Sequence, residues 1–145
     1  MFFARNKIRR TRTLSCYGQE NNMRKRSIAA IFLHLIVEDK NGTRLGYVII
    51  LGMLNPNHCY EILRINLSER NKGYGKKAMS LTLDYLFNHL QAHRVWLDVR
   101  ERNHRAKHVY ESLGFQVEGV LRECIKTDDN YESLILMGML RTEYR

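Results

Sequence analysis

Hydrophobic positions in the first half of the chain follow the patterns of extended strands. Residues 27–37 are rich in β-branched and large apolar side chains, and residues 38–42 after them supply turn chemistry that ends in Asn-Gly. A second such run covers residues 43–51, and a third, alternating run covers residues 60–67 after a turn around Pro56. The pattern predicts a hairpin extended by a third strand, all antiparallel.

The spacing of apolar residues changes to three and four after Gly75 and keeps this helical period to about His93. We therefore expect a long helix that begins near Gly73. Residues 103–113 repeat the helical spacing, and Gly114 suits the left-handed conformation that ends many helices. The sequence thus predicts two amphipathic helices.

Short strand-like runs surround the second helix. Residues 94–99 form an apolar strand before it, and residues 115–126 and 131–140 form two strand-like runs after it, joined by a polar turn at residues 127–130. These two runs are expected to pair as a terminal hairpin. The order of elements predicts an α/β (α+β) fold with a mixed, mostly antiparallel central sheet flanked by helices.

The composition is that of a folded, soluble domain. The chain has 145 residues, of which 44% are hydrophobic and 27% charged. Its longest nearly uncharged apolar stretch, residues 27–37, covers about half of the roughly 20 residues that a bilayer requires, so no membrane partner is expected. Three cysteines without CxxC spacing indicate neither a zinc site nor a disulfide framework, and a reducing, cytoplasmic setting is expected.

Positive charge is concentrated at the start of the chain. The net charge is +9, and residues 1–27 contain eight Lys or Arg residues against Glu20 alone. We therefore divide the chain into a basic N-terminal arm, residues 1–27, and a nearly neutral domain, residues 28–145. The arm could contact an acidic partner, a neighbouring subunit or nothing. A transit peptide and an alternative start at Met23 are further interpretations.

A glycine-rich turn lies between the third predicted strand and the first predicted helix, at residues 70–75, with the sequence RNKGYG. Free N–H groups and the positive end of the helix dipole favour phosphate at such a position, and Lys72, Lys76 and Lys77 add positive charge. The alternative is a glycine that merely lets the chain turn. The P-loop and dinucleotide-binding patterns are both absent, which argues against an NTPase or a dehydrogenase.

A second motif lies in the second predicted helix, where five residues follow the pattern N-x-x-A-x-x-x-Y-x-x-x-G-F. These residues are Asn103, Ala106, Tyr110, Gly114 and Phe115. Together with R-x-x-G-x-G at residues 70–75, the motif resembles the GNAT N-acetyltransferase superfamily, and residues 118–122, EGVLR, are similar to its RimJ/RimL-like branch. The resemblance covers residues 31–144 and implies the acyl-CoA N-acyltransferase fold, in which two middle strands of the sheet splay apart.

The resemblance also implies a cofactor site for acetyl-CoA. In the family the glycine turn holds the diphosphate and the splayed strand receives the pantetheine arm. The corresponding residues of this chain are Ile65, Asn66, Leu67, Arg70, Asn71, Lys72, Gly73, Tyr74, Gly75 and Lys76. Asn103 would steady the cofactor, and Tyr110 would bind it and protonate the departing thiolate. The alternatives are a plain helix N-cap for Asn103 and a packed core tyrosine for Tyr110.

A general base must take a proton from the attacking ammonium. Glu61 is the candidate, because strict alternation would place it on one face with Leu63, Ile65 and Leu67, and an apolar surrounding would raise its pKa. The alternatives are a salt bridge for Glu61 and a catalytic role for Asp98 instead.

These residues predict an acetyl-CoA-dependent N-acetyltransferase that acts by direct attack in a ternary complex and needs no metal. Its acceptor is a primary amine: a protein N-terminus, a polyamine, an amino acid or an aminoglycoside. The paired edge strands are compatible with a homodimer. The alternative is a non-catalytic module that binds acyl-CoA or, through the basic arm, nucleic acid, although the arm has few aromatic residues for the latter role.

Overall fold

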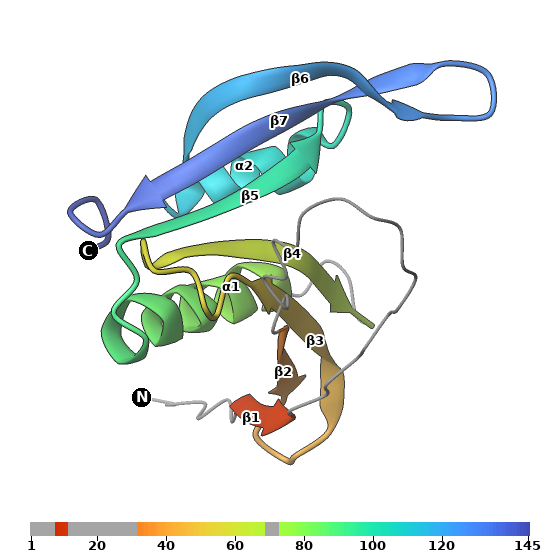
Figure 1. Ribbon diagram of the computed structural model, residues 1–145. Coiled ribbons are helices and arrows are strands. Elements are labelled where there is room, and N and C mark those ends of the chain that lie inside the picture. Colours follow the sequence, from red (N-terminus) through yellow and green to blue (C-terminus); the bar gives the residue numbers. More distant parts are fainter. Residues whose placement is uncertain (1–7, 12–31, 69–72) are drawn as a thin grey trace, which may run out of the picture.

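The computed structural model describes residues 8–11, 32–68 and 73–145 (Figure 1). Within these residues the chain forms one sheet of seven strands in the order β1-β2-β3-β4-β5-β7-β6, with two helices. The elements are β1 (Ile8–Thr11), β2 (Leu33–Glu38), β3 (Arg44–Leu51), β4 (Cys59–Leu67), α1 (Tyr74–Asp84), β5 (Arg94–Arg100), α2 (His104–Ser112), β6 (Gln116–Lys126) and β7 (Tyr131–Leu140). The predicted mixed, mostly antiparallel fold is confirmed.

Two elements differ from the expectation. The first long helix ends earlier, because α1 passes into a π-helical turn, Tyr85–His89, in which the Leu90 N–H donates to the Tyr85 carbonyl five residues back at 3.1 Å. In addition, residues 8–11 of the predicted arm form strand β1, which pairs antiparallel with β2. Apart from this strand, the arm lies outside the described residues.

The middle of the sheet is split. Strands β4 and β5 are parallel and pair only through Cys59, Tyr60 and Glu61, opposite Arg94, Val95 and Trp96. Beyond Glu61 the two strands diverge, as their separation toward one end of the sheet shows in Figure 1. The splay of the middle strands is therefore present, and it opens over the last six residues of β4.

A bulge in β4 changes the face on which its side chains lie. Opposite β3, Ile62 pairs with Ile50 but Arg64 pairs with Ile49, so Leu63 is an extra residue in the strand. A one-residue shift moves every following side chain to the other face. The predicted sharing of a face between Glu61 and the pair Ile65 and Leu67 is therefore wrong.

The hydrophobic core lies between the sheet and the two helices. Its most buried side chains come from β2, β3, β5, β7, α1 and the π-helical turn, and they include Val48, Met79, Phe87 and Met137. Tyr60 and Ile62 of β4 belong to this core, and Ile65 and Leu67 pack against it. The helices consequently cover the face that these four residues share, and the alternate residues of β4, Glu61 among them, lie on the opposite face.

Candidate active site

A pocket of about 440 Å³ opens where the sheet is split, between α1 and α2. Its lining residues are Ile65, Asn66, Leu67, Gly73, Tyr74, Gly75, Lys76, Met79, Asn103, Arg105, Ala106, Val109 and Tyr110. The volume lies in the range of sites for small molecules and cofactors. All nine of the predicted cofactor residues that the structure describes are thus brought together at this pocket, although they come from three separate segments of the chain.

The glycine turn forms one wall of this pocket. Gly73 is the N-cap of α1 and adopts φ of +73°, a left-handed conformation that a glycine adopts without strain. No side chain caps this helix end, and a Cβ at Gly73 would meet nothing within 4 Å. The first N–H groups of α1 are therefore accessible from the pocket. Of the other residues predicted for this turn, Arg70, Asn71 and Lys72 lie outside the described residues.

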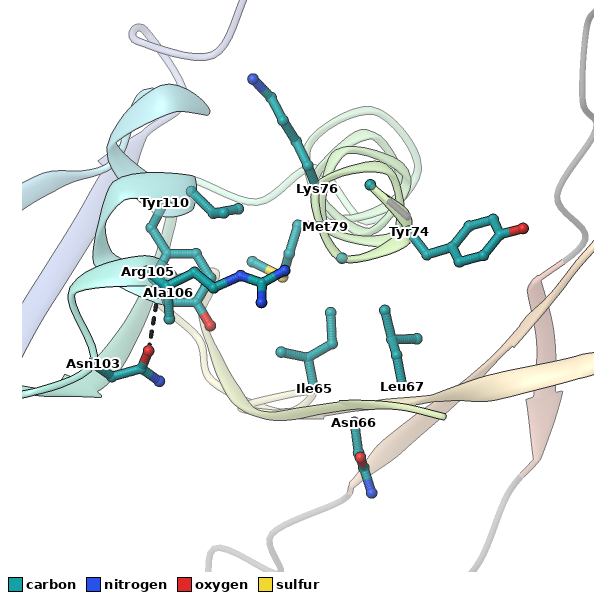
Figure 2. Close-up of a pocket in the computed structure, with 13 residues that line it drawn as sticks. Ile65, Asn66, Leu67, Tyr74, Lys76, Met79, Asn103, Arg105, Ala106 and Tyr110 are labelled. Atoms are coloured by element: carbon teal, nitrogen blue, oxygen red, sulfur yellow. Dashed lines mark hydrogen bonds between the residues drawn. The ribbon is translucent and has the colours of Figure 1, made fainter. Parts of the chain in front are cut away.

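Side chains from β4 and α1 contribute unequally, as Figure 2 shows. Ile65 and Leu67 point from β4 toward α1 and form an apolar floor, whereas the Asn66 side chain points to the other side of the strand. Asn66 therefore offers the pocket only its backbone. Tyr74 and Lys76 both project away from the space between the helices.

Asn103 caps the second helix and lines the pocket as well. Its side-chain oxygen accepts a hydrogen bond of 3.1 Å from the N–H of Ala106 in the first turn of α2. The amide nitrogen is not used in this bond and remains a donor for a ligand. The capping role considered from the sequence is thus present, and it is compatible with binding a cofactor.

Tyr110 is held by the C-terminal end of α2. The N–H groups of Gly114 and Phe115 donate to the carbonyls of Glu111 and Tyr110, at 3.0 and 3.1 Å, which is the Schellman arrangement. Gly114 allows it with φ of +103°. Phe115 is buried in the core and contacts the Tyr110 ring edge-on at 6.0 Å between centroids. The G-F pair of the motif thus fixes the position of Tyr110.

The two catalytic candidates lie in the electrostatic field of one carboxylate. Burial raises the pKa of Tyr110 above its ordinary value, and the negative charge of Asp98 raises it further. Burial also raises the pKa of Glu61, and Asp98 again adds to the effect. Glu61 pairs with Trp96, two residues before Asp98, so both carboxylates lie on the face of the sheet opposite the helices.

Sequence reasoning did not single out three lining residues, namely Met79, Arg105 and Val109. On α2, Arg105 and Val109 are spaced four residues apart, as are the motif residues Ala106 and Tyr110, and residues at this spacing share one face of a helix. Projecting α2 as a helix from Ala106 and Tyr110 would have found Arg105 and Val109 beside them. Met79 is a buried core residue of α1.

The described part of the chain shows neither a cluster of metal ligands nor a membrane-spanning helix. It holds no group of three or more His, Cys, Asp or Glu side chains that could bind a metal ion. None of its helices is both long enough and apolar enough to cross a bilayer.

Comparison with known proteins agrees with this geometry. Residues 7–115 match the acetyltransferase (GNAT) family. The chain belongs to this family. The matched region includes the glycine turn, the splayed strand and the whole of α2 with its G-F end. The family predicted from the two sequence motifs is thereby confirmed.

Some relatives carry the name spermidine N(1)-acetyltransferase. The spermidine N(1)-acetyltransferase of Vibrio cholerae is 30% identical over 75% of this chain and 64% of its own length. The enzyme of the same name from Escherichia coli K12 is 33% identical over 74% of this chain and 59% of its own length. The crystal structure of spermidine N-acetyltransferase from Vibrio cholerae in complex with CoA and spermine superposes with a TM-score of 0.73 and 28% identity, over 78% of this chain and 68% of that one. The chain spans about three-fifths of the length of these curated relatives.

Proposed function

We propose that this chain is an acetyl-CoA-dependent N-acetyltransferase that transfers the acetyl group directly to a primary amine. The observation that carries the proposal is the split between β4 and β5. It places Tyr110 at a pocket on the helix side, while Glu61 lies on the opposite face of the sheet. The cofactor and the amine can then approach the reacting centre from two sides.

The pocket residues fit acetyl-CoA in shape and charge. The N–H groups at the start of α1 would hold the diphosphate, because the helix dipole adds positive potential there. The pantetheine arm would follow β4 past Ile65 and Leu67, where backbone groups on the side of the split lack a neighbouring strand to bond. The two amide groups of the pantetheine arm need such backbone groups as hydrogen-bond partners. The amide nitrogen of Asn103, at the N-terminal end of α2, would add a hydrogen-bond donor.

The proposed reaction needs one base and one acid. Glu61, directly or through a water, takes a proton from the acceptor ammonium. The free amine attacks the thioester carbonyl carbon, a C–N bond forms, and the C–S bond breaks. Tyr110 donates its phenolic proton to the departing sulfur. Neither Cys59 nor Cys124 lines the pocket, so transfer through an acetyl-cysteine is not part of this proposal.

A polyamine is the acceptor class we propose among those that the sequence left open. The support comes from relatives named spermidine N(1)-acetyltransferase and from the superposed structure in complex with CoA and spermine. An acidic pair, Glu61 and Asp98, on the face opposite the cofactor suits a cationic acceptor. The RimJ/RimL-like branch, with its protein N-terminal acceptors, is the second candidate for the acceptor class. The homodimer and the cytoplasmic location also remain predictions.

Calorimetric titration with acetyl-CoA tests the cofactor assignment. Three proteins are compared: the wild type, Gly73→Asp and Gly73→Asn. Asp and Asn have nearly the same size and both tolerate the left-handed conformation, so they differ mainly in charge. We expect Asp to abolish binding by repelling the diphosphate and Asn to weaken it only modestly. Equal binding by all three proteins would contradict a phosphate site at this turn.

A thiol-release assay with spermidine then tests the activity. If the wild type binds acetyl-CoA and releases CoA only when spermidine is present, the proposed function holds. If it binds acetyl-CoA but no amine promotes release, the chain is the non-catalytic acyl-CoA-binding module. If it binds no acetyl-CoA at all, both readings fail.

A further inference from the structure

The charged residues of the pocket are all positive. Among its lining residues, Lys76 and Arg105 are cations and none is acidic. The first turns of both α1 and α2 also lack acidic side chains. Two helix N-termini, whose dipoles are positive, therefore border the pocket with no negative charge beside them. Such a surrounding favours an anionic ligand.

The two cations differ in where they point (Figure 2). The Lys76 side chain extends away from β4, out of the space between the helices. The Arg105 side chain crosses from α2 toward α1, and its guanidinium lies in the space above Ile65. Of the two cations, Arg105 is thus the one whose side chain extends into the space between the helices.

Arg105 also differs from the three arginines that precede it most closely in the chain. Arg94 forms an ion pair with Glu118, and both Arg100 and Arg102 pair with Glu132. Among the residues that the structure describes, Arg105 has no ion-pair or hydrogen-bond partner. Its five N–H donors are therefore available to a ligand, and a guanidinium can bind phosphate oxygens with two parallel hydrogen bonds.

We propose that Arg105 binds the diphosphate of CoA from the α2 side, opposite the glycine turn of α1. This inference rests on the proposed function, because it assumes that the pocket takes CoA. The diphosphate would then lie between two walls: backbone N–H groups from Gly73 onward and the guanidinium from α2. The guanidinium lies between the helices and over β4, along the path toward Tyr110. The 3′-phosphate belongs to the adenosine end, farther from the thioester, and so it is not the group assigned to Arg105.

Binding of CoA and of dephospho-CoA to Arg105→Met tests the assignment. Both ligands carry the diphosphate, but only CoA carries the 3′-phosphate. Loss of one charge-assisted contact typically weakens binding about 10- to 100-fold. We expect the same factor for both ligands, measured by calorimetry at one fixed salt concentration. Arg105→Lys keeps the charge but loses the two-pronged geometry, and it should restore part of the affinity.

Arg102→Met is the matched control. It removes the same charge three residues earlier in the chain, but Arg102 is paired with Glu132 and does not line the pocket. Its dissociation constants should stay within about twofold of the wild type, since long-range charge effects are screened by salt. An effect as large as that of Arg105→Met would mean that general charge, and not a contact, explains the loss.

Three outcomes would overturn the inference. A loss of affinity for CoA but not for dephospho-CoA would move Arg105 to the 3′-phosphate. Unchanged affinity for both ligands would remove Arg105 from the site while leaving the cofactor assignment intact. Failure of the wild type to bind either ligand would overturn the cofactor assignment itself. Because Arg105 is exposed, thermal melts of the variants should match the wild type.

Discussion

The two edges of β5 show opposite uses of a β-strand. Along one edge, β5 pairs with β7 at every residue from Arg94 to Arg100. Along the other edge, it pairs with β4 at three residues and then separates. The closed edge belongs to the part of the sheet that continues into β6. The open edge faces the split, and the pocket at the split is lined by β4 and the two helices. The same strand is therefore held on one side and leaves the sheet open on the other.

The difference shows how a sheet can contain a cleft without losing its integrity. Backbone N–H and C=O groups are costly to leave unpaired, so a strand with two open edges would be poorly held. Here the long antiparallel β5–β7 ladder, the core residue Val95 and the helix packing hold β5 in place. The groups along the open part of β4 are then free to bond an extended polar ligand, in the manner of strand addition.

The largest effect is expected from Tyr110→Phe, at the pocket beside the split. The phenylalanine keeps the ring that contacts Phe115 but removes the proton donor. If Tyr110 acts as the general acid, kcat should fall about 100- to 10,000-fold. The dissociation constant for acetyl-CoA, measured by calorimetry, should change little. A variant with wild-type kcat would show that Tyr110 is only a packed core residue.

Glu61→Gln should have the next largest effect. The substitution keeps the size of the side chain and removes the base, so kcat/KM near neutral pH should fall by about 100-fold. Because the wild-type rate should rise with pH as Glu61 loses its proton, this acidic limb of the pH profile should disappear in the variant. Persistence of the same limb would assign the base role elsewhere, with Asp98 as the first candidate.

Asp98→Asn should change the pH profile more than the maximal rate. Asp98 raises the pKa of both Glu61 and Tyr110, so its neutralisation lowers both values. The base then ionises at lower pH, and the acid loses its proton at lower pH as well. Both limbs of the bell-shaped profile should therefore move in the acidic direction, as measured by kcat/KM across pH.

Glu118→Gln provides the control for this shift on the closed edge. Glu118 is a carboxylate on β6, whereas Asp98 lies on β5. Glu118 pairs with Arg94 and does not contribute to the pKa shifts of Glu61 or Tyr110. Its profile should match the wild type. A shift of only one limb in Asp98→Asn would mean that Asp98 influences only one of the two groups.

The smallest effect is expected from Gly138→Ala on the closed edge. A Cβ at Gly138 would collide with the Glu118 carboxylate, the flexible end of a side chain that lies across β7 toward Arg94. The side chain can move aside, and a partly exposed ion pair contributes at most about 1 kcal/mol. Urea unfolding should therefore show a loss below about 1 kcal/mol, with acetyl-CoA affinity unchanged. A marked loss of affinity would show that the two edges are coupled.

Local features of the site were predictable from the sequence because each depends on a few neighbouring residues. Gly73 was identified as the start of a helix with open N–H groups, and Gly114 as a left-handed helix end. Asn103 was identified as an N-cap candidate, and it caps α2. These are short-range relations of backbone conformation and hydrogen bonding, which the residue types largely determine.

Other features depended on the partner of a strand. The bulge at Leu63 has no glycine or proline to mark it, and it arises only where β4 pairs with β3. Strict alternation therefore placed Glu61 on the same face as Ile65 and Leu67, whereas the bulge separates them. The insertion of β7 between β5 and β6 likewise depends on contacts between residues far apart in the chain. Arg105 was overlooked because its importance comes from what lies across the pocket.

By itself, the sequence determined the helices, most of the strands, the anion-favouring turn and the motif that indicated the family, since these follow from hydrophobic period, capping and turn chemistry within a few residues. Only the tertiary structure decided where the sheet opens, which side chains face the opening, and that Asp98 influences both Glu61 and Tyr110. The physical reason is that strand pairing, burial and electrostatic fields act through space between segments that the chain order keeps apart.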